Sequence, residues 1–146
     1  MPYFDTGQKY SIYWDGKPPH MLDNDIPVWQ EWMRLYKHNY DYMLYDVKLT
    51  TIDVGDMDMG KQAVKMWMAN IAKRIDVVAV KGDNIDIIEV TKRAFLRAVG
   101  QAICYREIWK SASTLKGNLT SCILCTQVDV DILLTCGIHD IKVITV

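Results

Sequence analysis

The sequence predicts an α/β domain with a small mixed sheet flanked by helices. Three observations lead to this prediction: the chain has 146 residues, half of them are apolar, and short apolar runs alternate with longer segments of helical periodicity. Charged residues make up 24% and the formal net charge is -1, which excludes a protein that coats DNA through its overall charge. The chain also has eight Met and five Trp, residue types that are frequent where proteins pack against partners.

We expect residues 1–26 to form an extended N-terminal arm and residues 27–146 to form the α/β domain. The arm contains three prolines and five aromatic residues at no regular spacing. Its rings need a surface to pack on, either the chain's own domain or a neighbouring subunit. No apolar run reaches the roughly 18–20 residues of a membrane helix, and the first residues lack a signal-peptide pattern. We therefore expect a cytoplasmic protein that does not contact a membrane.

The first part of the domain has one clear helix and one clear strand. Pro27 fits the first position of a helix, and apolar residues then follow at helical spacing to about residue 40. Alternating apolar and polar side chains predict the strand. The expected elements are the helix 27–40, the strand 44–52, an acidic turn over 53–60 and a weaker helix over 61–72.

The middle of the chain predicts a β-hairpin followed by a long helix. RIDVVAV (74–80) and IDIIEVT (85–91) are apolar on both faces, as central strands are, and KGDN between them is a turn. A strand over 119–127, a short helix from Asp129 to Gly137 and a last strand over 141–146 complete the chain. The long helix spans 92–111, and we expect it to bury Phe95, Ala98, Val99, Ala102, Ile103 and Trp109.

Cys122 and Cys125 form a C-x-x-C pattern that could suggest a zinc or redox site. On a strand, however, an offset of three places the two thiols on opposite faces. No second pair of Cys or His completes a zinc site. We therefore expect reduced and mostly buried cysteines.

The hairpin brings two carboxylates together. If the turn centres on KGDN, Asp76 and Glu89 are direct cross-strand partners, with Cβ atoms roughly 4.5–5.5 Å apart. Opposed like charges in an apolar hairpin are destabilising, and a bound Mg²⁺ or Mn²⁺ would compensate them. The alternative is that one carboxylate is exposed at the end of the sheet or pairs with Arg74 or Lys73.

The segment from Arg74 to Tyr105, in the middle of the chain, resembles the PD-(D/E)XK nuclease superfamily. In that family an Asp heads the second core strand, here Asp76, and an acidic residue lies on the third, here Glu89. Gln101 and Tyr105 match the Gln-x-x-x-Tyr that one branch carries on the next helix. The resemblance implies a restriction-endonuclease-like α-β-β-β-α-β core.

The resemblance also implies a chemistry, which is attack of metal-activated water on a DNA phosphodiester. In this interpretation the carboxylates and a backbone carbonyl hold Mg²⁺ or Mn²⁺, and one face of the helix contacts the DNA strand. The metal ligands would be Asp76, Glu89 and the carbonyl of Val90, and the substrate-binding residues would be Arg97, Gln101 and Tyr105.

The sequence departs from the family at the catalytic lysine, which should follow Glu89 by two positions. Thr91 occupies that position, and Lys92 follows one residue later. In a regular strand Lys92 would face the opposite side, unless a bulge or the start of the helix turns it back. Loss of such a positive charge costs on the order of 10²–10³ in rate. We expect Lys92 to be a displaced third catalytic residue beside Asp76 and Glu89, and we leave open whether the chain is an enzyme.

More narrowly, the chain is similar to small nuclease-like proteins encoded among the head and tail genes of tailed bacteriophages. The similarity lies in KRIDVVAV, IIEV, RAFLRAVGQAICYREIW and the C-terminal ILLTCGIHDIKVITV. It leaves two alternatives: a metal-dependent DNA endonuclease or exonuclease, or a catalytically degenerate fold that serves as a structural virion protein at the portal, neck or head–tail junction. A DNA-binding module without cleavage lies between them.

Each alternative implies partners and a location. Between positions 92 and 116 the sequence has six basic residues and one acidic residue, a local positive charge that suits contact with the DNA backbone. The virion alternative implies other phage structural proteins and a homo-oligomer, because an aromatic arm and an excess of Met and Trp suit packing between subunits. We expect the host cytoplasm as the location, with incorporation into the phage particle under the second alternative.

Overall fold

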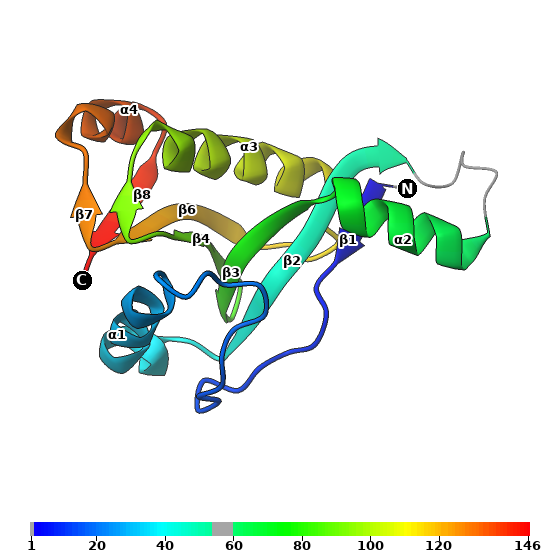
Figure 1. Ribbon diagram of the computed structural model, residues 1–146, viewed down its shortest axis with the longest axis horizontal. Coiled ribbons are helices and arrows are strands. Elements are labelled where there is room, and N and C mark those ends of the chain that lie inside the picture. Colours follow the sequence, from blue (N-terminus) through cyan, green and yellow to red (C-terminus); the bar gives the residue numbers. More distant parts are fainter. Residues whose placement is uncertain (1, 54–59) are drawn as a thin grey trace.

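The computed structural model describes residues 2–53 and 60–146. A six-stranded mixed sheet forms its centre, with α1 on one face and α3 on the other (Figure 1). Its strands, in spatial order, are β1 (Pro2–Asp5), β2 (Tyr42–Asp53), β3 (Lys73–Lys81), β4 (Asn84–Val90), β6 (Asn118–Cys125) and β8 (Ile141–Thr145). The helices are α1 (Ile26–Tyr36), α2 (Lys61–Ile71), α3 (Leu96–Ala112) and α4 (Leu133–Ile138), with 3-10 turns η1 (Lys37–Asn39) and η3 (Val130–Ile132).

The α/β class, with a mixed sheet flanked by helices, is confirmed. Helix α1 precedes the antiparallel strands β2, β3 and β4, and α3 then crosses to β6, which runs parallel to β4. Helix α2 is inserted between β2 and β3, as the weaker helical signal predicts. Of the predicted acidic turn, residues 54–59 lie outside the described residues.

The predicted register of the hairpin is also confirmed. The five pairs between β3 and β4 run from Val77 opposite Ile88 to Lys81 opposite Asn84. Gly82 makes the tight turn possible because its φ of 56° lies in the left-handed region that glycine adopts at no steric cost. Extending this register by one pair opposes Asp76 to Glu89.

Side-chain alternation along β2 and β3 reverses at one point. Tyr45 and Val77 pack on the α1 side of the sheet, whereas Val47 and Ile75 pack on the α3 side. Val47 is two residues from Tyr45, and Ile75 is two residues from Val77, a spacing that in a regular strand would place both members on the same side. The pairing of the two strands skips the positions between them, and the skipped residue of β2, Asp46, has a φ of 52°. Such irregularities re-aim side chains, and this one lies beside the carboxylate pair.

The N-terminal segment packs on the chain's own core. Strand β1 pairs antiparallel with β2, and Tyr10 forms an isolated bridge with Met43. The ring of Tyr10 also contacts the rings of Trp14 and Tyr45, with centroid distances of 4.6 and 4.9 Å. Of the two surfaces that the sequence leaves open for these aromatics, the structure uses the domain itself.

Replacing Tyr10 by Ala tests this packing. We expect the free energy of unfolding to fall by about 1–3 kcal/mol, because two aromatic contacts and buried area are lost. Tyr13→Ala is the matched control, since Tyr13 is 69% exposed and should change stability little. Urea unfolding of the two variants measures both effects, and equal stability of the variants would contradict the packing role.

Two predictions about the segment after β4 are wrong. The helix begins at Leu96 rather than at residue 92, because Arg93–Ala94 form a short strand, β5, that pairs in parallel with β7 (Gln127–Val128). Phe95, which was expected in the core, is 53% exposed. The extended backbone at Phe95 (φ -124°, ψ -167°) keeps this residue out of the helix, so the helical spacing that predicted its burial does not apply to it.

The cysteine prediction is confirmed for the sheet. Cys122 packs on the α1 side, and Cys125 packs on the other side with α3 and α4. All four cysteines are free, and three of them are buried, Cys104 being exposed.

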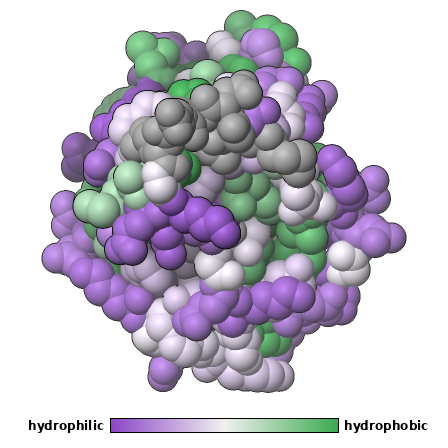
Figure 2. Space-filling model, turned by 90° about the vertical axis from the view of Figure 1, so that its right-hand side faces the viewer, coloured by the Kyte–Doolittle hydropathy of each residue, from purple (hydrophilic) through white to green (hydrophobic). Residues whose placement is uncertain are grey.

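The helices and the surface near α2 bear on membrane and protein partners. Within residues 2–53 and 60–146, no helix combines the length and hydrophobicity that a bilayer crossing requires. Figure 2 shows the end of the molecule that carries α2, where hydrophilic and hydrophobic side chains are mixed. Met66 and Trp67 of α2 are among the exposed apolar residues, at 65% and 37%.

Candidate functional site

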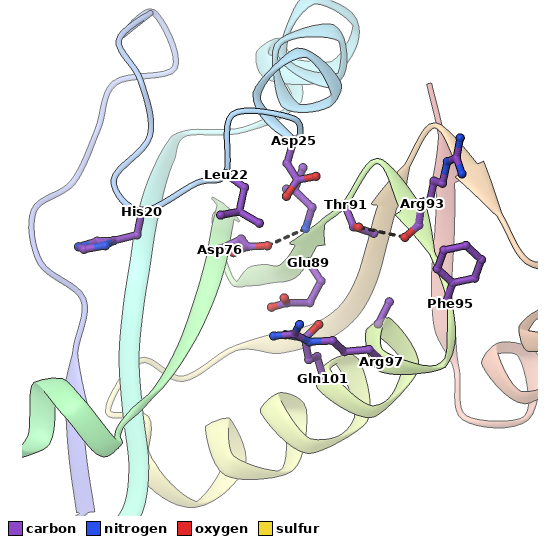
Figure 3. A pocket seen from close by; sticks show the side chains of 12 residues that line it. His20, Leu22, Asp25, Asp76, Glu89, Thr91, Arg93, Phe95, Arg97 and Gln101 are labelled. Atoms are coloured by element: carbon purple, nitrogen blue, oxygen red, sulfur yellow. Dashed lines mark hydrogen bonds between the residues drawn. The ribbon is translucent and has the colours of Figure 1, made fainter.

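A cavity of about 290 Å³, the carboxylate pocket, lies between the end of β4, the start of α3 and the loop before α1 (Figure 3). It collects residues from segments far apart in the chain. Those that carry chemistry are His20, Asp25, Asp76, Glu89, Thr91, Arg93, Arg97 and Gln101.

The two predicted carboxylates both line this pocket. Asp76 is held by its backbone neighbour across the hairpin, since its Oδ2 accepts a hydrogen bond of 2.9 Å from the Val90 N–H. Glu89 is only 5% exposed. Its Oε1 is buried and has no hydrogen-bond partner in the described part of the chain. Val90, whose carbonyl is the predicted third ligand, also lines the pocket.

Burial makes both carboxyl groups weaker acids than exposed Asp and Glu side chains. It raises the pKa of Asp76 to about 6, although the hydrogen bond from Val90 acts in the opposite direction. Burial also raises the pKa of Glu89, and the charge of Asp76 raises it further. The metal-free pair therefore holds a proton more tightly than ordinary carboxyls do.

These residues fit a hard divalent cation. An unpaired, buried carboxylate oxygen is costly, and Mg²⁺ or Mn²⁺ bound at it would remove that cost. No three His, Cys, Asp or Glu side chains of the described residues are arranged to hold one ion. A cation here would therefore take two carboxylates, the Val90 carbonyl and water, a ligand set that Mg²⁺ accepts.

Asp25 is a third carboxylate of the pocket, and sequence reasoning missed it. Its Oδ1 accepts a hydrogen bond of 2.9 Å from the backbone N–H of Lys92, which ties the loop before α1 to the end of β4. Burial raises the pKa of Asp25, and its charge in turn raises that of Asp76. The sequence shows only an Asp at the start of a helix, a position that usually indicates a cap, yet here the side chain makes no cap hydrogen bond.

The structure does not bring Lys92 to the carboxylate pair. Lys92 lines a different hollow, which it shares with Glu31 of α1 and the C-terminal Val146. Thr91 does line the carboxylate pocket, but its hydroxyl donates to the carbonyl of Arg93 at 3.0 Å. The position at which the nuclease resemblance predicts a lysine thus holds a neutral group that is already hydrogen-bonded.

The predicted substrate-binding residues lie along one face of α3. Arg97 and Gln101 line the pocket, and Figure 3 shows both reaching toward the Glu89 carboxylate. The charge of Arg97 lowers the pKa of Glu89, against the larger effect of burial. Tyr105 is one turn further along, where its hydroxyl accepts a hydrogen bond of 3.5 Å from the Gln101 amide.

A cluster of basic residues surrounds Asp46, and one of them, His20, also lines the pocket. Arg74, Lys48 and His20 approach the Asp46 carboxylate at 3.3, 3.4 and 3.5 Å. The alternative that Arg74 neutralises Asp76 or Glu89 is therefore not what the structure has, since Arg74 pairs with Asp46.

The chain was compared with models of protein families, with curated proteins and with solved structures. None of the three comparisons finds a match.

Proposed function

We propose that the protein hydrolyses DNA phosphodiester bonds with a divalent cation held by Asp76 and Glu89. The observation that carries this proposal is the buried, unpartnered Oε1 of Glu89 beside a second carboxylate in a pocket of about 290 Å³. Leaving such an oxygen unsatisfied costs roughly 1–3 kcal/mol or more, which a purely structural hairpin would have no reason to retain. Retained strain of this kind is typical of functional sites.

The roles of the residues follow from their positions. The Val90 N–H fixes the orientation of Asp76, and the apolar hairpin fixes Glu89. When bound, the cation would polarise the phosphate and lower the pKa of the attacking water. Asp25 lines the same pocket, and we assign it as the group that would accept a proton from that water; burial raises its pKa above that of an ordinary Asp.

Arg97 is our candidate for the positive charge that Thr91 does not supply. Its side chain points into the pocket near Glu89, and in the described part of the chain its guanidinium makes neither a hydrogen bond nor an ion pair. An unpaired guanidinium can bind a phosphate oxygen through two N–H groups and stabilise the charge that develops there.

We expect Arg97→Gln to slow DNA cleavage by about 10²–10³-fold, the usual loss for a transition-state charge donor. Lys92→Gln is the matched control and should leave the rate nearly unchanged, because Lys92 lines the other hollow. Initial cleavage rates in Mn²⁺ measure both. A larger loss of cleavage rate in Lys92→Gln than in Arg97→Gln would show that Lys92 moves into the site when substrate binds.

The proposed function itself is tested with purified protein and supercoiled, linear and single-stranded DNA. We expect nicking or degradation in Mg²⁺ or Mn²⁺ and none in EDTA. Absence of cleavage of all three DNA forms in both metals would overturn the proposal.

A second candidate function is a catalytically degenerate nuclease fold that serves as a structural protein of a phage particle. One observation favours it: Thr91 is neutral and hydrogen-bonded, and Lys92 lies in another hollow. The N-terminal arm adds less support to this candidate, since the rings of Tyr10 and Trp14 pack on the chain's own core. A ring-shaped oligomer in solution together with absence of cleavage would favour this candidate, whereas a cleaving monomer would exclude it.

A further inference from the structure

An exposed aromatic ring stands beside the carboxylate pocket. Phe95 is 53% exposed, and Leu96 next to it is 78% exposed. Single exposed apolar residues are common, so exposure alone indicates nothing. Phe95, however, lines two cavities at once: the carboxylate pocket and a second hollow of about 320 Å³. Arg93 lines both as well, so the two cavities meet along the ridge that Arg93 and Phe95 form.

The second hollow has a fixed floor. Strands β5 and β7 pair in parallel there, with Arg93 opposite Gln127 and Ala94 opposite Val128. The N–H of Asp129 donates to the carbonyl of Ala94 at 3.0 Å, which closes the end of this two-stranded sheet. The ridge is therefore held by backbone hydrogen bonds and keeps its shape without a ligand.

The groups around this hollow suit one ligand class. Phe95 offers an aromatic face, and Arg93 has no ion pair within the described residues. The amide of Gln127 is exposed, and Asp129 has one carboxylate oxygen, Oδ1, engaged with the N–H of Asp131 and a second oxygen available. An aromatic face can stack on a base, and a guanidinium can bind a phosphate. Amide and carboxylate groups can form hydrogen bonds with the polar edge of a base.

We propose that this hollow, the nucleotide subsite, binds one unpaired nucleotide next to the scissile phosphate of a DNA strand. The base stacks on Phe95, its phosphate meets Arg93, and Gln127 and Asp129 contact the base edge. A base within a duplex is already stacked and paired, so this subsite favours single-stranded DNA or frayed ends. The inference rests on the proposed function, because it takes the carboxylate pocket as the place of the scissile phosphate.

The test is binding of a short fluorescein-labelled single-stranded DNA, followed by fluorescence anisotropy in Ca²⁺. We expect Phe95→Ala to weaken binding by about 5- to 100-fold, the range expected for loss of one base–aromatic stack. Phe95→Tyr keeps the ring and should bind like the unaltered protein. Leu134→Ala is the matched control, because Leu134 of α4 is 75% exposed and does not line the subsite.

The outcomes separate this inference from the proposed function. Equal binding by Phe95→Ala and the unaltered protein, or equal loss in the Ala and Tyr variants, overturns the subsite even if cleavage still requires Asp76. Weaker binding by Phe95→Ala in a protein that cleaves no DNA supports the subsite and overturns only the hydrolysis. A duplex without ends that binds more tightly than the single strand also overturns the subsite. Thermal unfolding of each variant confirms that it is folded.

Discussion

We expect replacement of Asp76 by Asn, or of Glu89 by Gln, to abolish the proposed DNA cleavage and to make the metal-free protein more stable. Cleavage falls by about 10³-fold or more, because a catalytic metal contributes several kcal/mol to the transition state and each tenfold in rate corresponds to about 1.4 kcal/mol. Stability rises because an amide carries no charge into the apolar hairpin, where burial raises the pKa of both acids. We expect a gain of about 1 kcal/mol for each variant.

Asp86→Asn is the matched control. Asp86 lies on the same strand as Glu89, but its Oδ2 accepts a hydrogen bond from the Tyr40 hydroxyl on the α1 side of the sheet. This variant keeps an acceptor for Tyr40 and should keep cleavage. Cleavage rates in Mn²⁺ measure the first effect, and urea unfolding in EDTA measures the second. Loss of stability in Glu89→Gln would mean that its carboxylate has a structural partner, and retained cleavage would exclude it as a metal ligand.

The second large effect is the dependence of stability on pH. The pKa of Asp76 is about 6 in the folded protein and near 3.8 when unfolded, so the folded state binds its proton more tightly. This contribution to stability is complete below about pH 4 and disappears as the pH rises through 6. The shift corresponds to as much as about 3 kcal/mol, and the raised pKa of Glu89 acts in the same direction.

Urea unfolding in EDTA between pH 4 and pH 8 measures this effect, as the difference between the unaltered protein and Asp76→Asn. We expect the difference in stability between them to grow in favour of the variant as the pH rises. Mn²⁺ should remove this trend in the unaltered protein, because the ion binds the ionised carboxylates and replaces their proton. A difference that stays constant across this range would show that Asp76 is not perturbed in the fold.

Local signals in the sequence were enough to predict the hairpin and the carboxylate pair. A tight turn at Gly82 between two apolar strands permits one register, and that register places Asp76 and Glu89 together. The helix α1 was equally predictable, because Pro27 marks its start and its apolar stripe has one side to bury.

The rest of the site depends on contacts between distant segments. Asp25 reaches the pocket because its side chain binds the backbone of Lys92, a contact across 67 positions of sequence that no local pattern indicates. Phe95 was misplaced because β5 exists only through its pairing with β7, more than thirty residues later. Lys92 lies away from the pair because a bend at Lys92 and the short strand β5 separate the end of β4 from the helix, so the chain does not turn directly into α3.

The reversal of side-chain alternation between Asp46 and Asp76 has a consequence for the evolution of this protein. Both strands change phase at the same step, so Val47 and Ile75 remain neighbours and both stay in the layer under α3. Deleting the skipped residue of one strand alone would restore strict alternation there, but it would shift the pairing of that strand with its neighbour by one position. We therefore expect this part of the site to vary by substitution, because a deletion on one strand alone would misalign β2 and β3 where the pocket is built.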